Sequence, residues 1–187
     1  FWMSFHQNGL SLTMFARDFT DLSQISINLG FTTIQGAEIF QSINPICVVL
    51  LTPVIMGLFG WLRAKGIEPS TPRKIAIGMG IAALGFGVMA VGSHLSGRPD
   101  FAHKGGLTDV AKASPLLLIG TYVILTVAEL FISPLGLSFV SKVAPPQYQG
   151  IMQGAWLGAT AVGNSLLFIG ALLYESMPLR ATWSVFI

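Results

Sequence analysis

Residues 116–140 read LLLIGTYVILTVAELFISPLGLSFV, and this stretch decides the fold class. At ~1.5 Å of rise per residue, a helix of this length is long enough to cross the ~30 Å hydrocarbon core of a bilayer. Glu129 is the one charged residue in the stretch and lies near its centre. A charged carboxylate at the bilayer midplane costs roughly 3 kcal/mol or more unless it is protonated, paired or in contact with water. Glu129 is therefore the first candidate for a functional residue.

The composition of the whole chain agrees with a membrane environment. Charged residues make up 10% of the chain and hydrophobic residues 52%, with a mean hydropathy of +0.70, whereas soluble domains carry about 25% charged residues. The apolar stretches are long and continuous rather than alternating, which predicts an all-α integral membrane protein in the lipid bilayer. A net charge of +2 gives no indication of a nucleic-acid partner, and the single Cys47 excludes a disulfide framework and a cysteine-based metal site.

Six hydrophobic segments are predicted to be membrane helices. They cover about residues 1–16, 36–62, 72–95, 115–141, 147–174 and 180–187. The first and last are truncated, so we expect one bundle over residues 1–187 that is a piece of a longer polytopic chain. The connector 63–74 holds four Lys or Arg residues and is predicted to be cytoplasmic. Glu38, at the outer end of the second segment, is then either solvated or a contact of an exterior gate.

Side chains that lipid cannot satisfy recur inside four of these segments. They are His6, Gln7 and Asn8 in the first, Ser42 and Asn44 in the second, Glu129 and Ser133 in the fourth, and Gln153, Trp156 and Asn164 in the fifth. We expect them to face one another or a wet cavity. Trp156 lies in the middle of its segment rather than at a membrane interface, which favours the wall of a pocket over an aromatic belt.

Several of these residues also have a purely structural explanation. Glu129 could be a protonated carboxyl group bonded to a backbone carbonyl, and His6 a neutral hydrogen-bonding group between helices. Asn44 could cap backbone groups that Pro45 leaves free, and Ser133 could bond to the backbone of its own helix. An enzyme is not predicted, because the chain lacks HExxH, GxSxG and CxxC motifs.

A family resemblance rests on four stretches of the chain. They are FWMSFHQNGLSLTMFA, FQSINPICVVLLTP, AELFISPLGLSFVSKVAP and AWLGATAVGN. Their order and spacing resemble the C-terminal half of the proton-dependent oligopeptide transporters of the major facilitator superfamily. The resemblance implies that the six segments are helices seven to twelve of a multi-pass protein of the inner (cytoplasmic) membrane. It also implies an N-terminal helix bundle of the same protein as a partner, and no cofactor or metal beyond protons as the coupling ion.

The resemblance further implies proton-coupled symport of di- and tripeptides by alternating access. Glu129 and Asn44 match the acid of helix ten and the asparagine of helix eight that hold the amino terminus of the peptide in this family. Ser133 and Trp156 match further residues of that substrate site. The other functions that the residues leave open are a membrane-embedded enzyme and a structural membrane subunit with a buried acid.

One position departs from the common family pattern. Many members carry Glu-Gln on helix seven where this chain has His6-Gln7, and that glutamate is usually assigned to proton coupling. An imidazole can also exchange a proton near neutral pH, so His6 is a candidate for the coupling role. It gains positive charge on protonation, however, whereas a glutamate loses negative charge, so a direct salt bridge to the basic partner of that glutamate on helix one is not implied. The alternatives to His6 as the coupling group are Glu129 and acids outside this chain.

Overall fold

The computed structural model describes residues 1–20, 26–28, 33–37, 39–95 and 113–187 of the chain. The elements in these ranges are α1 (Trp2–Phe5), the 3-10 helix η1 (His6–Gly9), α2 (Ser11–Phe19), β1 (Ser26–Asn28), β2 (Thr33–Gln35), α3 (Ile39–Ala64), α4 (Thr71–Leu95), α5 (Pro115–Val143), the 3-10 helix η3 (Pro146–Tyr148), α6 (Gln149–Ser165), α7 (Leu167–Ser176) and α8 (Leu179–Val185). Glu38 and the greater part of the connector after α4 lie outside the described residues.

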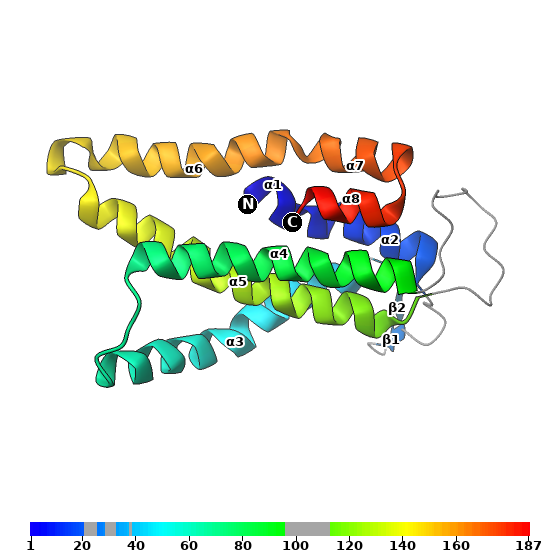
Figure 1. Cartoon of the computed structure of the whole chain (residues 1–187), viewed down its shortest axis with the longest axis horizontal. Coiled ribbons are helices and arrows are strands. Elements are labelled where there is room, and N and C mark those ends of the chain that lie inside the picture. Colours follow the sequence, from blue (N-terminus) through cyan, green and yellow to red (C-terminus); the bar gives the residue numbers. More distant parts are fainter. Residues whose placement is uncertain (21–25, 29–32, 38, 96–112) are drawn as a thin grey trace.

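The helices form a bundle in which α4 and α5 lie side by side at the centre (Figure 1). Helices α6 and α7 run along one edge of the bundle, and α1, α2 and α8 lie between that edge and the central pair. Helix α3 packs against α5 and then diverges from it toward the loop that leads into α4. This arrangement places α3 against α5 and α1 against α6.

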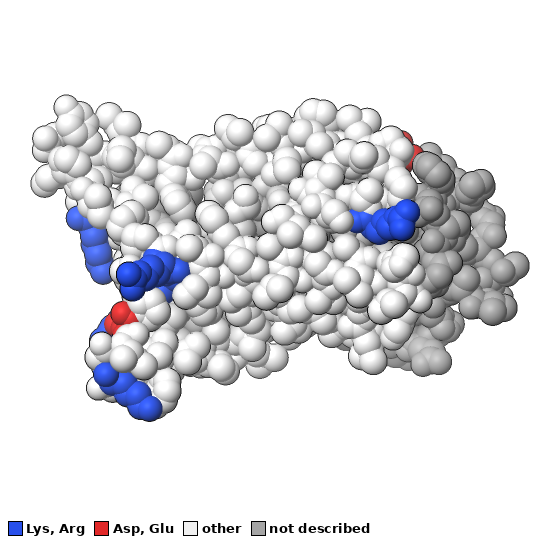
Figure 2. Space-filling model, viewed as in Figure 1, with Lys and Arg blue, Asp and Glu red and all other residues white. Residues whose placement is uncertain are grey.

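Four helical stretches in the described residues are long and apolar enough to cross a membrane. They are Ile39–Ala64, Thr71–Leu95, Pro115–Val143 and Pro146–Ser176. On the face drawn in Figure 2, Lys, Arg, Asp and Glu side chains gather toward the two ends and leave an uncharged band between them. A band of this kind suits the hydrocarbon core of a bilayer.

Small residues allow α4 and α5 to approach closely. A Cβ atom added at Gly78 would lie 2.7 Å from Ile132 Cγ1 and 2.8 Å from Phe131 Cβ, both closer than side-chain atoms pack. Glycine is therefore required at this crossing, as is common where membrane helices pack backbone to backbone.

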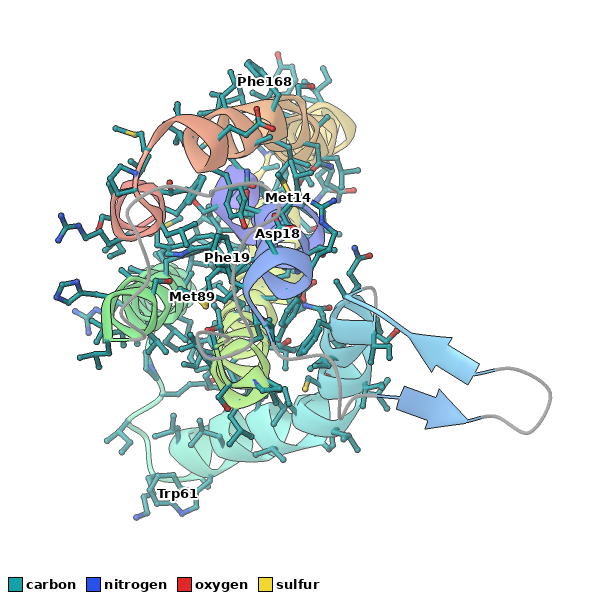
Figure 3. The ribbon with its side chains drawn as sticks, turned by 90° about the vertical axis from the view of Figure 1, so that its right-hand side faces the viewer. Met14, Asp18, Phe19, Trp61, Met89 and Phe168 are labelled. Atoms are coloured by element: carbon teal, nitrogen blue, oxygen red, sulfur yellow. The ribbon has the colours of Figure 1, made fainter. Side chains whose placement is uncertain are left out.

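Aromatic side chains fill the space between α2, α4 and α8. Trp183 is fully buried, donates a hydrogen bond of 3.1 Å from Nε1 to Ser93 Oγ, and stacks on Phe86 with ring centroids 6.4 Å apart. Figure 3 shows Phe19 and Met89 directed into the bundle, where both are buried, and Phe168 and Trp61 on its outside, where both are exposed. The polar group of Trp183 thus has a partner inside an apolar core, as buried indole nitrogens usually do.

Three charged side chains, which we call the loop cluster (Arg63, Glu68, Lys74), hold the connection between α3 and α4. Glu68 lies in the loop and pairs with Arg63 of α3 and with Lys74 of α4. Glu68 accepts from Arg63 Nε at 2.8 Å and from Lys74 Nζ at 2.5 Å. Lys74 is buried, and its ammonium group also lies 4.1 Å from the centre of the Phe59 ring. The cluster ties the end of α3 to the start of α4 at the connector predicted to be cytoplasmic.

The structure differs from the sequence-based expectation in three local features. The first hydrophobic segment is not one helix, because η1 interrupts it and Leu10 leaves helical geometry at φ −121° and ψ −83°. The fifth segment is interrupted at Leu166, between α6 and α7. The short antiparallel hairpin β1–β2, with Ile27 paired to Ile34, adds two strands to an otherwise all-α fold.

The break in the first segment has a physical cause in its sequence. Asn8 and Gly9 are poor helix formers, and the carbonyl groups that the break frees need other partners. Tyr122 Oη donates to the carbonyl of Asn8 at 2.6 Å, and Gln41 Nε2 donates to that of Gly9 at 3.3 Å. Side chains of α5 and α3 thus satisfy the broken turn.

Candidate functional site

One face of α5 carries a line of residues at positions 122, 126, 129, 133 and 136. The spacing of four, three, four and three residues keeps them on one side of a helix. Glu129 is at the centre of the line and is half-buried. Thr126, one turn before it, donates to the carbonyl of Tyr122 at 2.8 Å, so its hydroxyl oxygen stays available as an acceptor for another helix.

Asn44 of α3 makes the direct contact with this line. Its Nδ2 donates to Glu129 Oε2 at 3.2 Å and lies 3.4 Å from Thr126 Oγ1. Asn44 is thus bonded across to α5 instead of capping the backbone freed by Pro45. Glu129 likewise accepts from an amide side chain and is not bonded to a backbone carbonyl. The structure therefore places together the two residues predicted to hold a peptide amino terminus.

His6 approaches the same carboxylate from η1. Its Nδ1 lies 2.9 Å from the carbonyl oxygen of Trp2, one turn earlier, and its ring stacks on the indole of Trp2 at 5.5 Å between centroids. The imidazole interacts electrostatically with the carboxylate of Glu129. His6 thus bonds within its own helical turn and does not join two helices by a hydrogen bond.

Ser133 of α5 and Trp156 of α6 lie toward the α5–α6 connection. Ser133 is half-buried, and its hydroxyl makes no hydrogen bond to any other described residue, so the alternative of a bond to its own helix is wrong. Trp156 of α6 lies against Gly136, where the six-membered ring of the indole covers the backbone of α5. No side-chain hydrogen bond of the described residues joins either of them to the Glu129 carboxylate.

Other residues expected near the cavity lie elsewhere in the structure. Gln153 donates to Ser141 at 3.0 Å near the end of α5, and Asn164 is exposed on α6. Gln7 is buried but donates to the carbonyl of Leu167 on α7. A metal centre finds no support in the part of the chain that the structure describes, which holds no group of three or more His, Cys, Asp or Glu side chains.

Sequence reasoning missed Thr126, Tyr122 and Gly136. Their signal is present in the sequence, because all three share the helical face of Glu129 at intervals of three and four residues. A threonine or a glycine in an apolar helix is too common to be selected without its partners on other helices.

The comparisons with known proteins show the family. The sequence model described as the POT family matches residues 1–182. A protein named peptide transporter YePEPT from Yersinia enterocolitica subsp. palearctica is 35% identical over 168 residues, which cover 88% of this chain and 29% of that protein. Dipeptide and tripeptide permease B of Salmonella typhimurium is 33% identical over 147 residues, 76% of this chain and 28% of the permease.

Solved structures show the same fold. A crystal structure of a peptide transporter POT in complex with sulfate superposes with a TM-score of 0.79 at 27% identity, over 99% of this chain and 34% of that one. A POT family transporter in complex with a thioalcohol-conjugated peptide gives 0.74 at 25% identity, over 99% and 35%. The chain thus spans about a third of the length of the relatives it matches. These relatives are transporters and not enzymes.

Proposed function

The chain belongs to the POT family, and from this premise we propose that it forms the C-terminal helix bundle of a proton-coupled symporter for di- and tripeptides. In this proposal Glu129 and Asn44 bind the amino terminus of the peptide, and Ser133 and Trp156 line the same cavity. The partner is an N-terminal bundle of the same protein, which meets the carboxylate end of the peptide. The protein works in the inner membrane by rocking of the two bundles around the bound substrate.

The observation that carries the proposal is the hydrogen bond from Asn44, in the second turn of α3, to Glu129, at the middle of α5, because both helices are long and apolar enough to span a membrane. A carboxylate has room for about four hydrogen bonds, and Asn44 is its one donor among the described residues. An ammonium group brings three N–H donors and a positive charge, so it supplies what this carboxylate lacks. The amino terminus of a short peptide is such a group.

The proton-coupling role falls to His6 in this proposal, with Glu129 as the second candidate. The two groups interact electrostatically, so a change of charge on one alters the free energy of the charged form of the other. The interaction supports a link between proton transfer and peptide binding at this site.

Uptake of labelled dialanine into proteoliposomes tests the proposal, using the complete protein that contains this chain. An inward proton gradient should drive accumulation, and Glu129→Gln should abolish both accumulation and binding. Gln153→Ala is the control, because Gln153 is bonded to Ser141, away from the site. If no peptide accumulates and Glu129→Gln leaves peptide binding unchanged, the proposed function is wrong.

A further inference from the structure

The position of Trp156 is fixed by the absence of a side chain at Gly136. Gly136 is buried in α5, and a Cβ atom added there would overlap the Cζ2, Cη2 and Cε2 atoms of the Trp156 indole. Overlap with three ring atoms of a rigid side chain cannot be relieved by a small rotation. The indole therefore lies flush on α5 because residue 136 is a glycine.

This contact lies on the same face of α5 as the proposed ammonium site. Gly136 follows Glu129 by seven residues, which is almost two helical turns and ~10.5 Å along the axis. Ser133 lies between them, half-buried and without a hydrogen bond to another described residue. The Trp156 indole thus closes one end of the strip of α5 surface that begins at Glu129.

We propose that Gly136 determines substrate specificity by setting how much room Trp156 leaves beside Ser133. This rests on the proposed function, since the room in question accommodates the side chain of the peptide residue whose ammonium group binds Glu129. With glycine at 136 the indole stays against α5 and the strip remains open for a large side chain. A larger residue at 136 pushes the indole off α5 and into that space.

The test compares uptake of dialanine and of phenylalanyl-alanine by proteoliposomes that contain the complete protein. Gly136→Ala should lower kcat/KM for phenylalanyl-alanine relative to dialanine by about tenfold, the scale at which pockets discriminate small changes of volume. Gly120→Ala is the matched control, because it lies on the same helix and an added Cβ meets no atom within 4 Å. Its ratio should equal that of the unaltered protein.

Two further variants connect the effect to the indole. Gly136→Ala combined with Trp156→Phe removes the ring atoms that the new methyl group meets, and should restore the ratio. Trp156→Phe alone should raise the uptake of phenylalanyl-alanine relative to that of dialanine. If Gly136→Ala does not reach the membrane folded, this variant alone tests the inference.

The outcomes separate this inference from the proposed function. If the unaltered protein transports both peptides but neither Gly136→Ala nor Trp156→Phe changes the ratio, Gly136 is a packing residue and the inference is wrong while peptide transport stands. Equal loss of both peptides in Gly136→Ala, without rescue by Trp156→Phe, has the same meaning. If the unaltered protein transports neither peptide, the proposed function and this inference both fall.

Discussion

Replacing Asn44 by alanine removes the one side chain that joins α3 to the carboxylate of Glu129. The amide nitrogen lies 3.2 Å from Glu129 Oε2 and 3.4 Å from Thr126 Oγ1, so the first bond is at the long end of the usual N–H···O range and the second is longer than that range. Without Asn44 the carboxylate loses its one hydrogen-bond donor among the described residues and the contact that fixes its orientation. We expect peptide binding to weaken because the ammonium group then meets a less well-positioned acceptor.

The size of the effect follows from the geometry of these bonds. A hydrogen bond to a charged group contributes about 1.5–3 kcal/mol, whereas polar bonds between membrane helices average about 0.6 kcal/mol with a maximum near 1.7. Because both bonds of Asn44 are long, we expect Asn44→Ala to weaken the binding free energy of dialanine by about 1–2 kcal/mol. This change raises the Kd of dialanine by a factor of about 5 to 30.

Isothermal titration calorimetry of the complete protein with two ligands measures the contribution of Asn44 to binding of the peptide amino terminus. Dialanine carries the ammonium group and N-acetyl-dialanine does not. The Kd of N-acetyl-dialanine divided by the Kd of dialanine therefore measures the contribution of the amino terminus to binding. Asn44→Ala should reduce that ratio by the factor given above. Gln41→Ala is the control, because this amide lies one turn earlier on α3 and bonds to Gly9 and Thr13 instead. Equal weakening of both ligands by Asn44→Ala, or the same change of ratio in Gln41→Ala, would refute the assignment.

Three further outcomes are expected. His6→Gln should abolish gradient-driven uptake of dialanine but spare counterflow exchange, because it removes the titrating group and leaves Glu129 in place; equal loss of both activities would make His6 a binding or packing residue. Gly78→Val should lower the thermal unfolding midpoint, at a cost of about 1–3 kcal/mol for overpacking, whereas Gly80→Val on the same helix, where an added Cβ meets no atom within 4 Å, should not. In the loop cluster, hydrogen bonds from Arg63 and Lys74 lower the pKa of Glu68 from 4.5 to about 2. The stabilising effect of Glu68 is therefore present above pH ~4.5 and is lost as the pH falls toward ~2. The thermal unfolding midpoint should fall between these two pH values, and it should fall by a smaller amount in Glu68→Gln.

The sequence predicted the helical membrane fold because the long apolar runs leave no other way to satisfy the backbone in lipid. It did not predict the hairpin β1–β2, since each strand has only three residues, too few for an alternating pattern to be recognised. The break at η1 was also missed. The polar run His6–Gly9 was noted, but the carbonyl groups that it frees depend on Tyr122 and Gln41, which are 114 and 32 residues away from their partners.

The candidate site shows the same division between local and long-range information. Glu129 can be recognised from the sequence alone, because an isolated charge in an apolar membrane helix is costly whichever way its side chain points. The family resemblance added Asn44, and the structure placed the pair in contact. Gln153 and Asn164 are also polar residues within an apolar segment, as Asn44 is. Gln153, however, bonds to Ser141, and Asn164 is exposed on α6. Hydropathy cannot separate these cases, because the side of α6 that a residue occupies depends on where α1 inserts between α6 and the central pair.

The incomplete hydrogen bonding around Glu129 connects the structural cost of this residue to its proposed use. A carboxylate fully satisfied by the surrounding helices would be cheap to bury but would gain little from a ligand. One without any partner would be protonated at this depth and would offer no charge. Asn44 supplies one hydrogen-bond donor to this carboxylate. The remaining acceptor positions are open among the described residues. The cost of removing the Glu129 carboxylate from water is already met when the bundle folds. An ammonium group that binds there therefore gains the attraction to the carboxylate without a further desolvation cost on the protein side, which is what a preorganised cation site requires.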